Sequence, residues 1–114
     1  MQARSQRRHD LIFCLQVFER GNPEPLGFLG NVTMSGVMVI SDKPLEPGRV
    51  LELEMQDHTA PAREPMVVTA SSVWCERDAD PRYYAVGFEL LDVPLRARQR
   101  LRALIDDMGF GRGP

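Results

Sequence analysis

Two groups of polar residues in this sequence have the types and the spacing to bind a small anion. One is an Arg-x-x-x-Arg pattern at the start of the chain, and the other is an Asn-x-Thr-x-x-Gly pattern further along. The residues are Arg4, Arg8, Asn31, Thr33 and Gly36, with Arg7 inside the first pattern. A guanidinium donates paired N–H bonds in a planar fork that fits phosphate oxygens. The second pattern adds an amide, a hydroxyl and a glycine, which allows a positive φ or a close backbone approach.

Short apolar runs separated by turn residues indicate the elements that must position these two groups. Runs rich in Val, Leu, Ile and Phe alternate with turns containing Gly, Pro and Asn, as is typical of strands. We expect strands near residues 11–19, 26–33, 37–41, 49–55, 66–76 and 83–91. Short strands joined by short connections predict an all-β antiparallel barrel or sandwich. The arginine pattern then precedes the first strand, and the second pattern lies between the second and third strands.

The end of the chain predicts one helix. Pro94 suits a first helical turn, with Asp92 or Val93 as the cap, and Gly109 is a usual stop. Apolar residues between them recur with helical spacing and form one stripe. The stripe consists of Ala97, Leu101, Leu104, Ile105 and Met108. We expect this stripe to pack on the strands and to cover an open end of the barrel.

Composition and length are those of one globular domain with unevenly distributed charge. The chain has 114 residues, of which 43% are hydrophobic and 26% are charged, and its net charge is −2. Residues 1–8 and 96–102 contain arginines and no acid, so the remainder is strongly acidic. A local arginine cluster is therefore needed to attract an anionic ligand. We expect a flexible arginine-rich arm at 1–9, a barrel at 10–92, a packed helix at 93–108 and a disordered tail at 109–114.

The sequence contains no recognisable catalytic or metal-binding set, so we expect a protein that is not an enzyme. Cys14, Cys75, His9 and His58 lack zinc-site spacing, and there is no nucleophile motif or phosphate loop. The arginines before residues 11–18 imitate an export signal, but the apolar stretch is short and has no Ala-x-Ala site after it. We expect a cytoplasmic protein with reduced thiols, no metal, no cofactor and no membrane insertion.

Taken in this order, the two patterns resemble the signature of the PilZ domain, a bacterial receptor module for cyclic di-GMP. The family signature is Arg-x-x-x-Arg followed by Asp/Asn-x-Ser-x-x-Gly, and Thr33 here replaces the usual Ser while keeping its hydroxyl. The resemblance extends to residues 45–48, 73–74 and 84–89 and covers roughly residues 4–106. It implies a six-stranded antiparallel Greek-key barrel, of the PilZ or split-barrel-like kind, with one C-terminal α-helix.

The resemblance also implies a ligand and its contacts. Cyclic di-GMP is a dianion with two guanines, and the O6 and N7 acceptors of guanine match the arginine fork. The side-chain oxygen of the asparagine can accept from a guanine N–H group, and the glycine leaves room for a base. The implied contacts are Arg4, Arg8, Asn31, Thr33 and Gly36, with Arg7 as a bystander or a second phosphate contact. The number of cyclic di-GMP molecules bound stays open.

The implied function is that of a receptor or adaptor. It would convert the second-messenger signal into a protein–protein interaction that controls motility, exopolysaccharide or virulence. Its partners would be cyclic di-GMP and an unidentified effector protein, with no nucleic acid polymer, and the protein would be a monomer or a ligand-dependent dimer. The alternative is a PilZ-fold adaptor in pilus or envelope assembly that does not bind the nucleotide. The two motif arginines favour the receptor.

Three further features remain open to interpretation from sequence. A small RNA-binding barrel would need basic and aromatic residues on one face, but the expected strands are acidic and aromatic residues make up 7%. Trp74 is interpreted as a core or barrel-rim residue rather than a platform for a base. The arginines of the final helix are interpreted as a solvated face, with docking of an acidic partner as the alternative, and Arg102 and Asp106 have the spacing of an ion pair.

Overall fold

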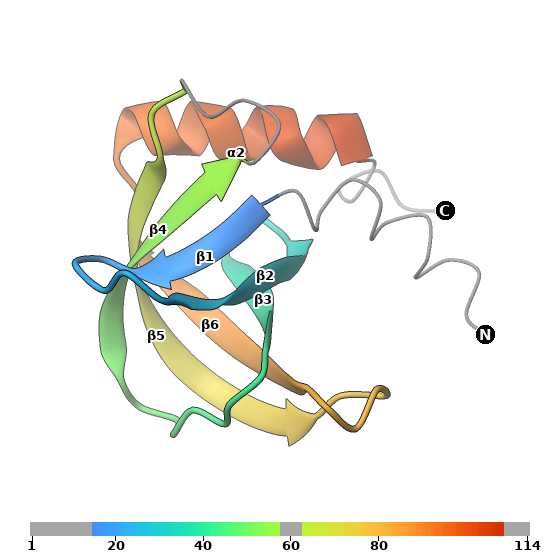
Figure 1. The fold of residues 1–114 in the computed structure, drawn as a ribbon. Helices are drawn as coiled ribbons and strands as arrows, with labels where there is room; N and C mark the ends of the chain where they lie inside the picture. Colours follow the sequence, from blue (N-terminus) through green and yellow to red (C-terminus); the bar gives the residue numbers. More distant parts are fainter. Residues whose placement is uncertain (1–14, 58–62, 109–114) are drawn as a thin grey trace.

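The computed structural model describes residues 15–57 and 63–108, which form a closed barrel of six antiparallel strands and one helix (Figure 1). The elements are β1 (Leu15–Glu19), β2 (Pro25–Val32), β3 (Gly36–Ser41), β4 (Val50–Asp57), β5 (Met66–Arg77), β6 (Tyr84–Asp92) and α2 (Leu95–Met108). This confirms the predicted all-β barrel with one C-terminal helix. The expected arm at 1–9 and tail at 109–114 lie outside the described residues, as do residues 10–14.

The strand order is β1-β2-β3-β6-β5-β4, and β1 pairs with β4 to close the barrel. Strands β1, β2 and β3 follow one another directly, and β4 returns to lie beside β1, which is the Greek-key arrangement. Gln16 therefore has two partners, Phe28 on β2 and Gln56 on β4. Closure pairs both sides of the short strand β1 and removes the free edges that invite association.

The core follows from alternation along the strands. In β4, Leu51, Leu53 and Met55 are buried, and Glu52 between them is exposed. Strands with one apolar and one polar face bury the apolar face when they close into a barrel. The helix α2 lies across one end of the barrel (Figure 1), where Ala97, Leu101 and Ile105 of its apolar stripe join the same core cluster and Leu104 packs against it.

The start of α2 differs from the cap that the sequence predicted. The helix begins at Leu95, and the backbone N–H of Arg98 donates to the carbonyl oxygen of Pro94 at 2.8 Å. Pro94 therefore precedes the first helical residue and accepts the first helical hydrogen bond, which makes it the cap position in place of Asp92 or Val93. Proline suits this place because it has no N–H group that needs a partner there.

Hydrogen bonds of one buried serine, Ser72, attach the connection between β3 and β4 to β5. The Ser72 hydroxyl donates to the carbonyl oxygen of Glu46 at 2.6 Å and accepts from the backbone N–H of Arg49 at 3.0 Å. The backbone of Ser72 also bonds with Gly48 and Arg49. Because the hydroxyl is buried with its partners, it holds the long crossover against the barrel without a desolvation penalty.

We expect Leu101→Ala to destabilise the fold by about 2–5 kcal/mol, because the substitution leaves a cavity where α2 meets the barrel. The Leu101 side chain is completely buried. Leu95→Ala is the matched control, since Leu95 lies on the same helix and is 70% exposed. Urea unfolding of both variants measures the difference. Equal stability of the two variants would show that the helix does not complete the core.

Candidate functional site

The β2–β3 turn that carries the Asn-x-Thr-x-x-Gly pattern is closed by the Thr33 side chain. Its Oγ1 accepts from the backbone N–H groups of Gly36 at 3.1 Å and Ser35 at 3.3 Å. The backbone N–H of Thr33 donates to the carbonyl oxygen of Gly36 at 2.8 Å. The Thr33 hydroxyl also lies within 3.3 Å of that carbonyl oxygen, so its donor and acceptor capacity is largely used inside the turn. In this structure Thr33 shapes the turn rather than presenting a free hydroxyl.

Asn31 lies on the outer side of β2, one residue before the buried Val32. Its Oδ1 accepts from the backbone N–H of Val32 at 2.8 Å, and the side chain is half-buried. A carbonyl oxygen has two lone pairs, so Oδ1 keeps one site for a further donor. Asn31 is thus oriented by its own backbone and still able to accept a hydrogen bond.

Gly36 is required by close packing of the backbone and not by a positive φ. Among the described residues, the glycines with positive φ are Gly21 and Gly48. A Cβ atom at position 36 would lie 2.8 Å from the carbonyl oxygen of Phe88 on β6. Of the two reasons that the sequence offered for this glycine, close approach therefore applies, although the neighbouring group in this structure is β6.

Arg4, Arg7 and Arg8 lie outside the described residues, but the barrel fixes where the chain that follows them begins. Strand β1 starts at Leu15 and runs antiparallel to β2, with Gln16 opposite Phe28. The first residues of β1 therefore lie at the end of the barrel where β2 finishes and the β2–β3 turn begins (Figure 1). The start of β1 and the β2–β3 turn thus lie toward the same end of the barrel.

A row of paired residues that the sequence did not predict continues from Asn31 across the outside of the barrel. Asn31 pairs with Met38 on β3, Met38 pairs with Gly87 on β6, and Gly87 pairs with Trp74 on β5. A Cβ atom at position 87 would overlap the indole ring, so that ring lies directly on the Gly87 backbone. We call Asn31, Met38, Gly87 and Trp74 the outer row.

Trp74 is on the outside of the barrel because β5 has an irregularity between Ser72 and Trp74. The buried Ser72 is followed by the exposed Val73, and Trp74 is 39% exposed. An added residue moves the following side chains to the opposite face, which simple alternation does not anticipate. The sequence left Trp74 in the core or at the barrel rim; its exposure excludes the core and agrees with the rim. An aromatic ring placed next to a glycine offers a flat apolar surface on which a base can stack.

The acidic side chains of the barrel determine the electrostatic potential around this surface. The described residues up to Asp92 contain thirteen acidic and six basic side chains. Among the basic ones, Arg20 pairs with Glu52 at 3.6 Å and Arg49 with Glu19 at 3.9 Å. An anion would therefore be repelled by most of the barrel unless additional positive charge is brought to it.

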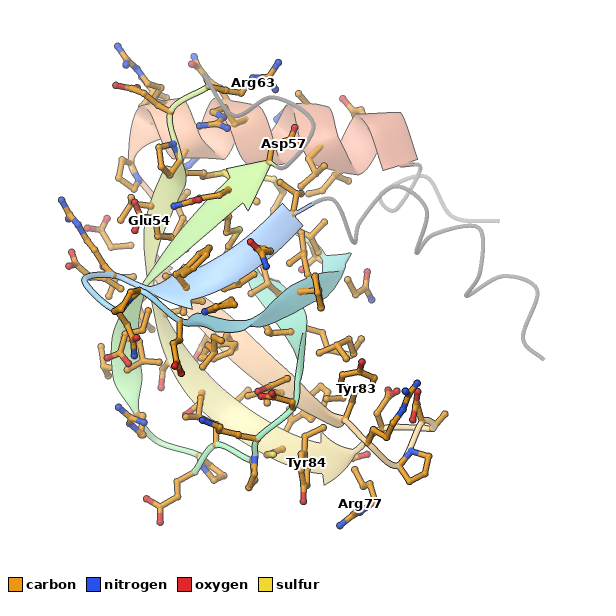
Figure 2. The ribbon with its side chains drawn as sticks, viewed as in Figure 1. Glu54, Asp57, Arg63, Arg77, Tyr83 and Tyr84 are labelled. Atoms are coloured by element: carbon orange, nitrogen blue, oxygen red, sulfur yellow. The ribbon has the colours of Figure 1, made fainter. Side chains whose placement is uncertain are left out.

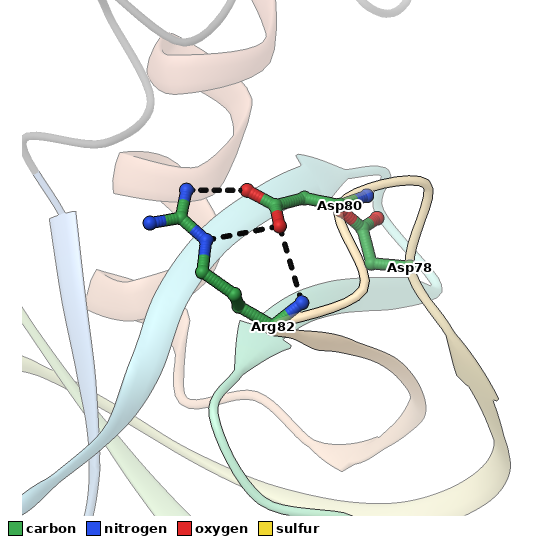
Figure 3. Close-up of polar contacts among 3 residues, drawn as sticks. All are labelled: Asp78, Asp80 and Arg82. Carbon is green, nitrogen blue, oxygen red and sulfur yellow. Dashed lines mark hydrogen bonds and ion pairs between the residues drawn. The ribbon is translucent and has the colours of Figure 1, made fainter.

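The β5–β6 hairpin, at the opposite end of the barrel, contains the one pair of described residues with resolved pKa changes. Asp80 accepts from Arg82 at Nη2 (2.6 Å), at Nε (3.1 Å) and at the backbone N (3.1 Å) (Figure 3). These bonds lower the pKa of Asp80, and the carboxylate raises the pKa of Arg82. Both groups keep their ordinary charge at neutral pH, so the pair is suited to fixing the turn.

Two further contacts order the same hairpin. Arg77 donates to the carbonyl oxygen of Pro81 at 3.0 Å. Its guanidinium carbon lies over the Tyr84 ring, 5.2 Å from the ring centroid, and Figure 2 shows both side chains with Tyr83 near them. These interactions order the loop between β5 and β6, the two strands that carry Trp74 and Gly87 of the outer row. In the part of the chain that the structure describes, no group of His, Cys, Asp or Glu could hold a metal ion.

The fold and the two motifs place the chain in one family. The family model of the PilZ domain matches residues 2–107, which includes both motifs and most of α2. The chain belongs to the PilZ domain family.

One solved structure supports the fold assignment. It is that of the Bacillus subtilis inhibitor of motility (MotI/DgrA), with a TM-score of 0.65 and 14% sequence identity. The similarity covers 91% of this chain and 50% of that chain, so the present chain spans about half the length of that protein. A search of curated proteins gave no match.

Proposed function

We propose that this PilZ domain binds cyclic di-GMP between its N-terminal arginines and the β2–β3 turn. It then passes the signal to an effector protein through a changed surface. Family membership supports a role as a receptor or adaptor related to cyclic di-GMP. The proposed ligand contacts are Arg4, Arg8, Asn31 and Gly36, with Thr33 shaping the turn and Arg7 as a bystander or a second phosphate contact.

The observation that carries this proposal is the position of β1 beside β2. Strand β1 starts toward the end of the barrel where β2 finishes. The segment that carries Arg8 therefore joins the barrel at the edge of the candidate site. Six residues lie between Arg8 and Leu15, so seven residue steps join them, and an extended chain spans about 3.3–3.6 Å per step, or roughly 23–25 Å. Gln16 pairs with Phe28, and β2 ends four residues later at Val32, about 13–14 Å along the strand, so this length is enough to reach the turn.

The chemistry of the two sides is complementary to a cyclic dinucleotide. The arginines supply the positive charge that the acidic barrel lacks, and their forks fit guanine O6 and N7 or phosphate oxygens. Asn31 keeps one acceptor site, and Trp74 provides a face for stacking at the far end of the outer row. A ligand with two bases and two phosphates can engage both sides together, and GTP, with one base, cannot bridge them in the same way.

The effector and the output belong to the same proposal. The solved relative is named an inhibitor of motility, and motility, exopolysaccharide or virulence control is the output that the family resemblance suggests. We propose a cytoplasmic, non-enzymatic protein that is a monomer or a ligand-dependent dimer. No helix in the described part of the chain has the length and hydropathy needed to cross a membrane. A pilus or envelope adaptor that does not bind the nucleotide is the alternative, and the next experiment separates the two.

We expect isothermal titration to show cyclic di-GMP binding, and Arg4→Ala and Arg8→Ala each to weaken it by about 5- to 150-fold. One bidentate arginine contact is worth about 1–3 kcal/mol. Arg20→Ala and Arg49→Ala are matched controls, because both remove an exposed arginine from the barrel, and they should bind as the parent does. Absence of binding by the parent protein would favour the nucleotide-free adaptor. Equal loss in all four variants would mean that only net charge matters.

Intrinsic fluorescence provides an independent test of the outer row, since Trp74 is the single tryptophan of the chain. We expect saturating cyclic di-GMP to change the emission, because a stacked base alters the surroundings of the half-exposed ring. Trp74→Phe should retain binding and Trp74→Ala should weaken it, both measured by titration calorimetry. Unchanged emission together with full binding by Trp74→Ala would restrict the site to the arm and the turn.

A further inference from the structure

The charges of α2 are arranged in the opposite order to the one that stabilises a helix. Its first turn contains Arg96 and Arg98 and no acid, and its last turn contains no base. The helix macrodipole favours negative charge at the N-terminus and positive charge at the C-terminus. Arginines at the start of α2 therefore work against helix stability. Proteins break such local rules mainly at functional or strained sites.

Two arginines on one side of α2 have a structural partner. Arg96 pairs with Glu64 at 3.4 Å, and Arg100 donates to the carbonyl oxygen of Glu64 at 2.6 Å. Both therefore attach the helix to the segment that leads into β5. This accounts for half of the arginine cluster in terms of the fold.

The other two arginines lie on the opposite side of the buried stripe. Arg98 and Arg102 are exposed, and within residues 15–57 and 63–108 neither side chain has an ion pair or a hydrogen bond. Leu95 precedes them at helical spacing on the same side and is 70% exposed. We call Leu95, Arg98 and Arg102 the helix flank. It combines one exposed apolar side chain with two guanidinium groups, one turn apart, that are unpaired within the described part of the chain.

We propose that the helix flank docks an acidic segment of a partner protein, with two carboxylates one helical turn apart facing Arg98 and Arg102 and an apolar side chain against Leu95. Charge complementarity supports this occupant, because guanidinium groups bind carboxylates through paired hydrogen bonds and arginine is enriched in protein interfaces. The proposal does not depend on nucleotide binding.

A short acidic segment fits the flank better than an extended polyanion does. A nucleic acid or an anionic membrane covers a wide area and would meet the acidic residues of the barrel, such as Glu89 and Asp92 on β6, the strand that precedes α2 in the chain. Ala97, Leu101 and Ile105 of the apolar stripe are buried in the core and are not available for insertion into lipid. A peptide segment can contact the flank alone.

Fluorescence anisotropy tests the proposal without cyclic di-GMP. The probe is a fluorescein-labelled helical peptide of about 20 residues, with glutamate pairs at i and i+4 and one leucine per two turns. The full chain should bind it at low salt, and the double variant Arg98→Gln/Arg102→Gln should bind about 5- to 30-fold more weakly. Arg20→Gln/Arg49→Gln removes the same charge from the barrel and should bind within about twofold of the parent.

Thermal unfolding separates lost binding from lost folding. Glutamine keeps high helix propensity, and removing a cation from the first turn favours the helix, so Arg98→Gln should melt at or above the temperature of the parent. Failure of the parent to bind the peptide, or equal weakening in both double variants, would overturn the proposal. Tighter binding to duplex DNA or anionic phospholipid vesicles, lost in the flank variant, would also overturn it by assigning the flank to another class of partner.

Discussion

The pairing of β1 with both β2 and β4 is the constraint on which the arrangement of this molecule depends. One five-residue strand closes the barrel, because Val17 lies opposite Gly27 on one side and Met55 on the other. The same pairing determines where the chain preceding β1 leaves the barrel. Since β1 is antiparallel to β2, that chain leaves next to the β2–β3 turn. The first residues of β1 and the β2–β3 turn are thus brought toward one end of the molecule by backbone hydrogen bonds.

Close contacts at glycines give the outer surface its form. Gly36 lets β3 approach the carbonyl oxygen of Phe88, and Gly87 lets the Trp74 ring lie on the backbone of β6. Neither position has space for a side chain. The result is a surface that runs from the turn to an aromatic ring over four neighbouring strands, with most of its positions set by strand register.

The sequence predicted the barrel and the helix because their signals are local. Alternation in β4 and helical spacing in α2 both report which face is buried. It did not predict that the Thr33 hydroxyl would be used within its own turn, since hydrogen bonds to nearby backbone groups depend on the turn geometry. It also did not decide between the core and the barrel rim for Trp74, because an irregularity in β5 reverses the faces beyond Ser72. The outer row depends on how four strands pair with one another. No local sequence pattern carries that information.

The most direct test of the account follows the backbone amides of the arm and of the turn in one titration. With cyclic di-GMP, nuclear magnetic resonance signals of residues 4–9 should shift together with those of residues 31–36, and the amides of the arm should become protected from hydrogen exchange. GTP at the same concentration should do far less. Saturating cyclic di-GMP that shifts signals elsewhere and leaves both groups unchanged would contradict the claim that the arm and the turn form the binding site.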